Sequence, residues 1–495
     1  MVKLKKILIT SMVFLSILVT SFVMASCKSP TGEKQVNYVI HVEDEAEVEQ
    51  LLNDTFRIDI KKIDVIFDYL PGTYTAECKA TLSFVMRQGQ GQRRPVIHLD
   101  PATRDKNTVR AIRLNNEPLD VFNEADVKIL DYTNSTQSAL EFQRDLAENI
   151  EHTLEIEYVL QLPQGYPRFS TEVNDLEGRG NEALFPTLNT PQEMSHHYFT
   201  FRVHGDREFR CIGSGLVERQ NPDQEGLRQW TLDTERDVAS FTVMFVLMPE
   251  EDTVFQTRRI GNVDVRIMAY QGGASIDSAF TQLESWIPQL ITDFGLFPMP
   301  RGLSIFLTST GGGMEYFGGT ITSLWALEHE VFHMYFACST INKTYRDLWM
   351  DEAINKWYSY SVDPAYRPIA DDYRSNIVSG RSAVAVGFDR RAYEEGAQII
   401  QSAAVRLGGR QEMIGFLSYL YRNYAFAPYT TIRFLDYLQE YSGVNMREDF
   451  QRWLYSDEQT TAAGAASTRY DRMIEQEKVD LTPPRSLLMK YGIRQ

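Results

Sequence analysis

The segment His329-Glu330-Val331-Phe332-His333 places two imidazoles and one carboxylate within five residues. On a helix, residues four apart lie side by side on one face, so both imidazoles can reach a single metal ion. Glu330 lies about 100° further round the helix, close enough to contact a water molecule on that metal. The segment therefore predicts a zinc centre in which Glu330, as general base, activates zinc-bound water for hydrolysis. A pair of hydrogen-bonded histidines in a protein core is the structural alternative.

A catalytic zinc ion needs a third protein ligand. No histidine follows His333 in the sequence, so we expect that ligand to be a carboxylate on a neighbouring helix. Residues 348–358 have the pattern of a helix and carry Glu352 near its start, 19 residues after His333. That separation leaves room for one helix to end, for the chain to turn and for a second helix to return. We therefore expect one zinc ion held by His329, His333 and Glu352.

This ligand set resembles the zinc site of the aminopeptidase N-type gluzincin metallopeptidases, with eighteen residues between the HExxH segment and the zinc glutamate. Residues 312–316 (Gly-Gly-Met-Glu-Tyr) are similar to the family's G-x-M-E-N/Y motif, and residues 393–396 (Tyr-Glu-Glu-Gly) are similar to its Y-E-K-G motif. The resemblance implies that Tyr393 stabilises the tetrahedral oxyanion. Glu395 and Asp351 depart from the family's usual Lys and Asn, and neither departure removes a zinc ligand or the base.

The resemblance also assigns substrate-binding residues. Glu315 is implied to hold the free amino terminus of a peptide, and its neighbours Gly312, Gly313 and Met314 belong to a glycine-rich strand with which a peptide can pair. A carboxylate suits this task because it meets an ammonium group with a charge-assisted hydrogen bond. Glu177, nine residues before the proline of a Phe-Pro turn, is implied as a second anchor for the amine.

The remaining sequence predicts the elements that position this site. Hydrophobic and polar residues alternate along much of residues 56–248, which is typical of β-strands with one buried face. Within this region, residues 241–248 predict a nearly continuous buried strand. Further along the chain the pattern indicates strands at 263–267 and 303–308, an amphipathic helix at 275–294 and then mostly helices.

These elements predict a multidomain α+β protein. We expect an N-terminal antiparallel β-sandwich-like domain at residues 53–252. The family resemblance implies a thermolysin-like, mainly helical zinc-peptidase domain with a small sheet at residues 253–456. A C-terminal tail is expected at 457–495, and the family's large helical C-terminal domain is expected to be absent because only 40 residues follow Tyr455.

Residues 1–26 have the features of a secretory signal, with lysines followed by an apolar run that ends shortly before Cys27. The ending Met-Ala-Ser-Cys resembles a bacterial lipobox, which implies cleavage before Cys27 and lipid on its sulfur. An uncleaved membrane anchor is the alternative, because the apolar run approaches the length that spans a bilayer. Residues 27–52 include many acidic residues, as in a solvated tether. We therefore expect a lipid-anchored protein of a bacterial cell envelope, facing the periplasm or the cell exterior.

The net charge and the positions of the other histidines argue against a nucleic-acid-binding surface and a second metal site. The formal net charge of −17 argues against a nucleic-acid partner, which requires a basic surface. The pair His196-His197 is expected at the surface or at the edge of the core rather than in a second metal site, and His98 is expected to be structural.

The motif and its spacing predict zinc-dependent hydrolysis, and the family resemblance implies that the substrates are peptides and that N-terminal residues are removed. A gluzincin endopeptidase that cuts internal bonds is the alternative within the same class. A non-catalytic peptide-binding or scaffold lipoprotein on the same fold is the alternative from a different class. Such a protein would be expected to have lost Glu330 or a zinc ligand, and this chain keeps all four residues.

Overall fold

The computed structural model describes residues 57–89, 93–131, 138–163, 168–171, 180–188, 190–222, 227–299, 301–359, 368–369, 373, 377–378 and 391–454. The expected signal peptide (1–26), Cys27, the acidic tether (27–52), Glu177 and the C-terminal tail (457–495) lie outside the described residues. None of the helices that the described residues form is both long enough and apolar enough to cross a membrane.

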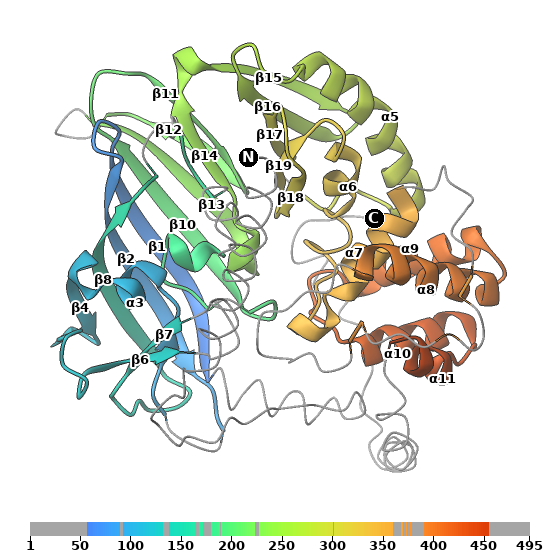
Figure 1. Ribbon diagram of the computed structural model, residues 1–495, viewed down its shortest axis with the longest axis horizontal. Helices are drawn as coiled ribbons and strands as arrows, with labels where there is room; N and C mark the ends of the chain where they lie inside the picture. Colours follow the sequence, from blue (N-terminus) through green and yellow to red (C-terminus); the bar gives the residue numbers. More distant parts are fainter. Residues whose placement is uncertain are drawn as a thin grey trace, which may run out of the picture. The chain divides into compact units, whose positions relative to one another are not determined.

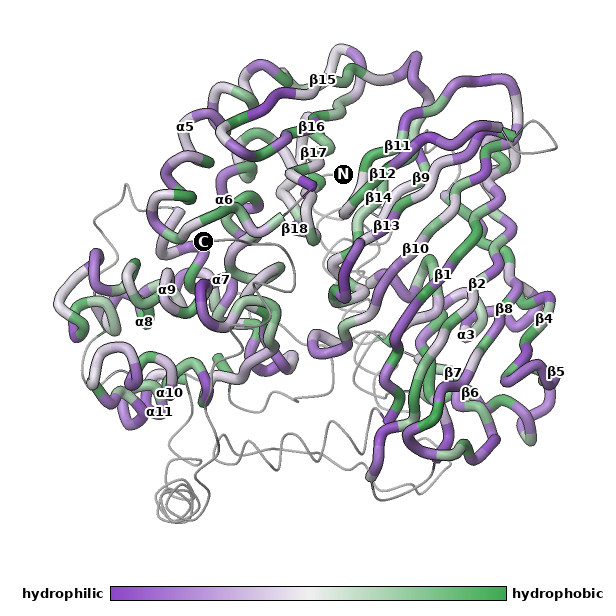
Figure 2. The backbone as a smooth tube through the Cα atoms, turned by 180° about the vertical axis from the view of Figure 1, so that it is seen from behind, coloured by the Kyte–Doolittle hydropathy of each residue, from purple (hydrophilic) through white to green (hydrophobic). Residues whose placement is uncertain are grey.

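An eight-stranded sheet forms the main part of the N-terminal half (Figure 1). In their order across the sheet the strands are β12 (Leu216–Gln220), β13 (Arg228–Ala239), β10 (Met194–Val203), β1 (Ile58–Leu70), β2 (Thr75–Met86), β8 (Glu151–Gln161), β4 (Val109–Leu114) and β5 (Glu117–Leu119). Buried residues alternate with more exposed ones along β2, β8 and β10, as the period-two pattern predicts. Figure 2 colours these strands by the hydropathy of their residues. The expectation of an antiparallel sheet does not hold at one pair, because β1 and β10 run parallel. Parallel neighbours need a long connection, and these two strands lie far apart in the sequence.

Two three-stranded sheets accompany the large one. One has the order β11 (Phe209–Gly213), β14 (Phe245–Pro249), β9 (Phe169–Ser170), and the other has the order β3 (Val96–Ile97), β7 (Ser138–Phe142), β6 (Val127–Asp131). The short helix α3 (Asp100–Arg104) follows β3. Phe67 and Phe201 of the large sheet pack against Phe245 of β14, with ring centroids 4.8 to 5.7 Å apart. The large sheet and the sheet that contains β14 therefore share one aromatic core, in which each fully buried phenylalanine contributes roughly 1.5–3 kcal/mol.

The strand predicted at residues 241–248 begins later than expected. Residues 240–242 form a single 3-10 turn, and β14 starts at Phe245. The side-chain amide of Asn181 donates hydrogen bonds to the carbonyl oxygens of Ser240 (2.6 Å) and Val243 (2.9 Å). A side chain from a distant segment therefore occupies carbonyls that a strand partner would otherwise use.

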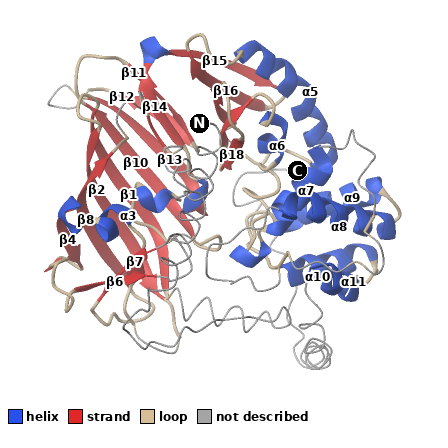
Figure 3. Cartoon of the chain, in the orientation of Figure 1, coloured by secondary structure: helices blue, strands red, loops and turns tan. Residues whose placement is uncertain are grey.

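The C-terminal half combines a five-stranded sheet with helices (Figure 3). In their order across the sheet the strands are β15 (Thr253–Ile260), β16 (Val263–Tyr270), β17 (Leu303–Thr308), β19 (Gly319–Ser323) and β18 (Gly313–Tyr316). The helices are α5 (Ile276–Phe294), α6 (Leu327–Phe332), α7 (Trp349–Ser359), α8 (Arg391–Leu407), α9 (Arg410–Tyr424), α10 (Thr431–Ser442) and α11 (Arg447–Leu454). The strand predicted at 303–308 matches β17, and the helix predicted at 275–294 matches α5 within one residue.

Helix α5 shows why this part of the chain folds as the sequence predicts. The side chain of Ser275 accepts a hydrogen bond from the backbone N–H of Ser278 and caps the helix start. Buried residues recur at helical spacing along it: Ile276, Ala279, Phe280, Leu283, Ile287, Leu290 and Phe294. Pro288 lies inside the helix on its exposed face, and the carbonyl four residues earlier belongs to the exposed residue Glu284. Water can satisfy that carbonyl, so the proline does not end the helix.

His197 lies in the hydrophobic core, deeper than the expected core edge, and hydrogen-bonds through Nε2 to the hydroxyl of Ser240 at 2.9 Å. Burial lowers the pKa of His197 to about 3, whereas the unfolded chain binds the proton near pH 6.5. The contribution of His197 to the free energy of unfolding is therefore fully present above pH 6.5 and is lost as the pH falls towards 3.

Because of this group, the free energy of unfolding of the wild type is expected to fall by roughly 1 kcal/mol for each pH unit in this window. We expect this fall to be absent in His197→Gln. Urea unfolding of both proteins at pH 7 and pH 5 provides the measurement. Parallel pH profiles for the two proteins would contradict the assignment.

Candidate functional site

Helix α6 carries the two imidazoles in adjacent turns. Its buried residues Leu327, Val331 and Phe332 pack against the core and fix the orientation of the helix. Helix α6 has only 6 residues. His333 is its C-terminal cap residue and keeps right-handed helical angles (φ −57°, ψ −18°). The backbone N–H of His333 still donates to the carbonyl of His329. The spacing of four residues therefore keeps both side chains on one face, as the sequence predicts.

The structure brings the three expected zinc ligands together. The Nε2 atoms of His329 and His333 are 3.2 Å apart, and the Oε2 atom of Glu352 lies 3.1 Å from the first and 3.5 Å from the second. Four ligands at about 2.0–2.1 Å from a tetrahedral zinc ion stand about 3.3 Å from one another. Two imidazole nitrogens and one carboxylate oxygen at these separations fit a zinc ion with one position left for solvent or substrate.

Neighbouring groups hold these ligands in place. The Nδ1 atom of His333 lies 2.9 Å from the carbonyl oxygen of Phe336, so Nδ1–H donates there and Nε2 keeps its lone pair for the metal. The side-chain amide of Asn355, one turn after Glu352 on α7, donates to the carbonyl of His329 at 2.7 Å. This bond ties α6 to α7. Sequence patterns did not single out Phe336 or Asn355, because their roles depend on contacts between separate segments.

The electrostatics of the cluster favour a cation at the point where the ligands meet. Although burial opposes it, the carboxylates of Glu315 and Glu352 raise the pKa of the His333 imidazole well above its ordinary value. Burial also opposes ionisation of Glu352, but hydrogen bonds from His329 and His333 hold the pKa of its carboxyl below the ordinary value. A divalent cation would satisfy the same field, because it neutralises the carboxylates and binds the neutral imidazoles.

Glu330 points towards this cluster from the strand-facing side of α6. It is buried, and a carboxylate oxygen of Glu330 lies within 4.8 Å of ligand atoms of Glu315 and His333. Burial and the nearby charge of Glu315 raise the pKa of the Glu330 carboxyl well above its ordinary value. Its Oε2 atom has no hydrogen-bond partner among the described residues. A buried carboxylate oxygen is costly without a partner, so this atom is available to accept a proton or a hydrogen bond from a molecule bound in the site.

Gly313 on β18 makes room for that carboxylate. A Cβ atom at residue 313 would lie 2.4 Å from both Cγ and Oε1 of Glu330, so only glycine lets the strand approach this closely. We expect Gly313→Ala to displace the carboxylate and lower kcat about ten- to a hundredfold, because a shift of about 1 Å at a reacting group can cost a hundredfold.

The matched control for this prediction is Gly312→Ala, where the added methyl group would have nothing within 4 Å. Steady-state kinetics of both variants on one peptide, with zinc content measured in parallel, provides the test. Equal losses of kcat in the two variants would mean that Gly313 is needed for its backbone conformation and not to make room for the carboxylate of Glu330.

Helix α8 brings Tyr393 to the cluster. Its hydroxyl donates to the Oε1 atom of Glu352 at 2.6 Å, and its ring centroid lies 5.9 Å from that of His329. Burial and the carboxylate of Glu352 raise the pKa of Tyr393, so the hydroxyl stays protonated and remains a donor. A Cβ atom at Gly396 would lie 2.7 Å from the Cβ of Ala353. This glycine therefore lets α8 pack closely on α7 and positions the tyrosine.

Glu315 and Met314 lie on β18, one of the two outer strands of the five-stranded sheet. Burial raises the pKa of Glu315, with His333 opposing the effect. The side chain of Met314 is 40% exposed beside it. An outer strand offers backbone groups to an extended peptide, and a carboxylate among them can meet the amino terminus of that peptide.

Trp325 is exposed although its neighbours in the sequence are apolar. Its side chain is 70% exposed and its indole N–H donates to the carbonyl of Gly311 at 2.7 Å. The residue precedes α6, in the connection from β19, where the helical periodicity does not apply. Trp325 and Met314 are thus two exposed apolar side chains on segments next to the cluster.

No family model matches this chain, and no curated protein matches it in sequence. Solved structures nevertheless share its fold. Legionella pneumophila aminopeptidase A in complex with aspartic acid has a TM-score of 0.65 at 15% identity, covering 81% of this chain and 50% of that one. An M1 zinc metallopeptidase from Deinococcus radiodurans has a TM-score of 0.58 at 17% identity, covering 80% of this chain and 94% of that one. Yeast LTA4 hydrolase has a TM-score of 0.60 at 13% identity, covering 81% of this chain and 68% of that one.

These similarities show the fold of the chain. It is the fold of the M1 zinc metallopeptidases, with a β-rich N-terminal region followed by a mainly helical region, and the fold predicted from the motifs is confirmed at that level. The chain spans about half the length of the Legionella aminopeptidase and nearly the whole length of the Deinococcus metallopeptidase.

Proposed function

We propose that this protein is a zinc-dependent peptidase that removes residues from the amino terminus of peptides. The observation that carries the proposal is the convergence of His329, His333 and Glu352 at separations of 3.1 to 3.5 Å. Two further carboxylates stand beside this ligand set with different environments. Glu330 is buried, and one of its oxygens has no partner in the part of the chain that the structure describes, whereas Glu315 lies on an outer strand where a peptide can pair.

Each residue has a task in hydrolysis. His329, His333 and Glu352 would hold a zinc ion, which would supply Lewis acidity for the scissile carbonyl and lower the pKa of water towards neutral. Glu330 accepts a proton from the attacking water on Oε2, which has no partner among the described residues, and passes it to the departing amine. The Tyr393 hydroxyl, a protonated donor next to the ligand set, is placed to donate to the oxygen that gains negative charge in the transition state.

Glu315 supports an aminopeptidase rather than an endopeptidase. Its carboxylate belongs to the same cluster as Glu330 and His333. A carboxylate so close to the reacting groups binds an ammonium group well and would leave an internal peptide segment facing an unpaired charge. The amino terminus of the substrate is therefore held one residue away from the bond that is cut.

We expect peptides with a free amino terminus to be cleaved about ten- to a hundredfold more efficiently than the same peptides with an acetylated terminus. The measurement is kcat/KM for the two peptides with zinc-loaded protein, with a chelator and zinc re-addition as the metal control. Glu315→Gln is expected to remove most of the difference between the peptides. Equal cleavage of both peptides by the wild type would favour the endopeptidase.

A further inference from the structure

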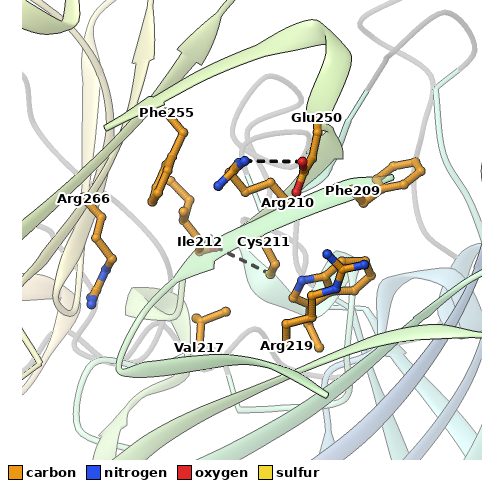
Figure 4. Close-up of a pocket in the computed structure, with 10 residues that line it drawn as sticks. Phe209, Arg210, Cys211, Ile212, Val217, Arg219, Glu250, Phe255 and Arg266 are labelled. Atoms are coloured by element: carbon orange, nitrogen blue, oxygen red, sulfur yellow. Dashed lines mark hydrogen bonds and ion pairs between the residues drawn. The ribbon is translucent and has the colours of Figure 1, made fainter. Parts of the chain in front are cut away.

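A cavity of about 310 Å³ lies where three sheets meet, and none of its lining residues belongs to the zinc site (Figure 4). Its walls come from outer strands of all three sheets: β11 of a three-stranded sheet, β12 of the eight-stranded sheet and β15 of the five-stranded sheet. Inner strands add Trp230 from β13 and Arg266 from β16. Outer strands leave side chains without a neighbouring strand to cover them, which accounts for a cavity at this junction.

The lining of the cavity is positively charged. It contains the three guanidinium groups of Arg210, Arg219 and Arg266, against the single carboxylate of Glu250. Glu250 lies 3.4 Å from Arg210, and outside the lining Glu208 pairs with Arg219 at 2.6 Å. Two of the three cations thus have a carboxylate partner.

Arg266 is the cation that remains. Its Nε–H donates to the hydroxyl of Ser304 at 3.2 Å, and no ion pair joins it to a carboxylate within the described part of the chain. Burial lowers the pKa of Arg266, partly balanced by Asp264. A guanidinium has five N–H donors, so those on the terminal nitrogens of Arg266 can still take an anionic ligand.

Aromatic and aliphatic side chains complete the lining and hold two of the cations. The Cζ atom of Arg210 lies 4.5 Å from the ring centroid of Phe255, and that of Arg219 lies 5.7 Å from the ring centroid of Trp230. Such cation–π contacts restrict the guanidinium groups before any ligand arrives. Val217 also lines the cavity and lies below Ile212 in the view of Figure 4. The cavity therefore offers positive charge and apolar surface side by side.

We propose that this cavity binds a small ligand in which a carboxylate adjoins an apolar or aromatic group, as in the C-terminal residue of a peptide. The carboxylate pairs with Arg266, and the apolar group contacts Val217 and the aromatic rings. The volume is at the lower end of the range for ligand pockets, about 300–1,000 Å³, which suits a ligand of amino-acid or dipeptide size. The site lies outside the zinc cluster and does not depend on the proposed peptidase activity.

Isothermal titration calorimetry of the zinc-loaded, full-length chain in detergent tests this proposal with three probes. N-acetyl-L-phenylalanine carries both features, its C-terminal amide lacks the charge, and inorganic phosphate lacks the apolar group. We expect saturable binding of the first probe at one site per chain and binding at least about tenfold weaker for the other two. Phosphate binding as tight as that of N-acetyl-L-phenylalanine would overturn the apolar part of the proposal, and tight binding of the amide would overturn the carboxylate part.

Variants show whether the probe binds in this cavity or at the zinc ion, which also attracts carboxylates. Arg266→Gln and the cavity-filling Val217→Trp are each expected to weaken binding of N-acetyl-L-phenylalanine about tenfold or more while zinc content and peptide hydrolysis stay at the wild-type level. Arg113→Gln is the matched control, because Arg113 lies on β4, far from β12 in the strand order of the large sheet. The proposal is overturned if no saturable binding is found at millimolar probe, or if binding survives both cavity variants in proteins with wild-type unfolding temperatures.

Discussion

Replacement of Glu330 by glutamine is expected to lower kcat for peptide hydrolysis by about a hundred- to ten-thousandfold while zinc stays bound. Glutamine has nearly the same shape, but its amide cannot accept a proton near neutral pH. The ligand atoms of His329, His333 and Glu352 are not changed, so the metal content per chain should equal that of the wild type. KM for a free-amine peptide should change little, because the amine is proposed to bind Glu315.

The same substitution has an expected effect on stability. Burial and the charge of Glu315 disfavour the ionised carboxylate of Glu330, so a neutral amide of similar volume removes an unfavourable charge from the interior. The unfolding temperature of Glu330→Gln should therefore equal or exceed that of the wild type, as is common where an active site is built at the expense of stability. This measurement separates loss of catalysis from loss of folding.

Glu328→Gln provides the matched control, since Glu328 lies two residues away on the same helix and outside the ligand cluster. The same acid-to-amide change there should leave kcat within a few-fold of the wild type. If the Glu330 variant keeps most of its activity with zinc bound, Glu330 is not the base. If the wild type binds one zinc ion and hydrolyses no peptide at all, the site serves binding rather than catalysis.

The pairing of His329 with His333 could be predicted because it is local. Residues four apart on a helix meet whatever surrounds the helix, so the pattern alone was sufficient. Glu352 was predictable for a related reason, since its spacing from His333 leaves room for one helix to end, for the chain to turn and for a second helix to return to the first. The structure places all three ligand atoms within 3.5 Å of one another.

Other features depend on contacts between distant segments and could not be predicted from local patterns. The parallel pairing of β1 with β10 joins strands that are far apart in the sequence. The side chain of Asn181 hydrogen-bonds to the carbonyl of Ser240, where the chain forms a turn instead of the start of the predicted strand. Trp325 is exposed although its neighbours are apolar, because the connection before α6 does not follow helical periodicity. Periodicity describes how a segment can be buried and leaves open which distant group will cover it.

Replacement of Tyr393 by phenylalanine is expected to lower kcat about a hundred- to a thousandfold with little change in KM. The Tyr393 hydroxyl lies 2.6 Å from the Oε1 atom of Glu352 and stays protonated because burial and that carboxylate raise its pKa. It can therefore act in two ways. It can donate to the developing oxyanion, which affects the transition state alone, or it can orient Glu352, which affects the metal.

Zinc affinity distinguishes these two roles. An oxyanion donor leaves zinc affinity nearly unchanged and lowers kcat even at saturating zinc, whereas loss of a group that orients a metal ligand typically weakens zinc binding about ten- to a hundredfold. Tyr358→Phe is the matched control, because the Tyr358 hydroxyl also donates to a carboxylate at 2.6 Å, that of Asp293, and lies on the same helix as Glu352. Tyr358→Phe should lower the free energy of unfolding without lowering kcat, because Asp293 is outside the ligand cluster. Full recovery of the Tyr393→Phe variant by excess zinc would assign Tyr393 to positioning the metal ligand and leave the oxyanion without a donor from α8.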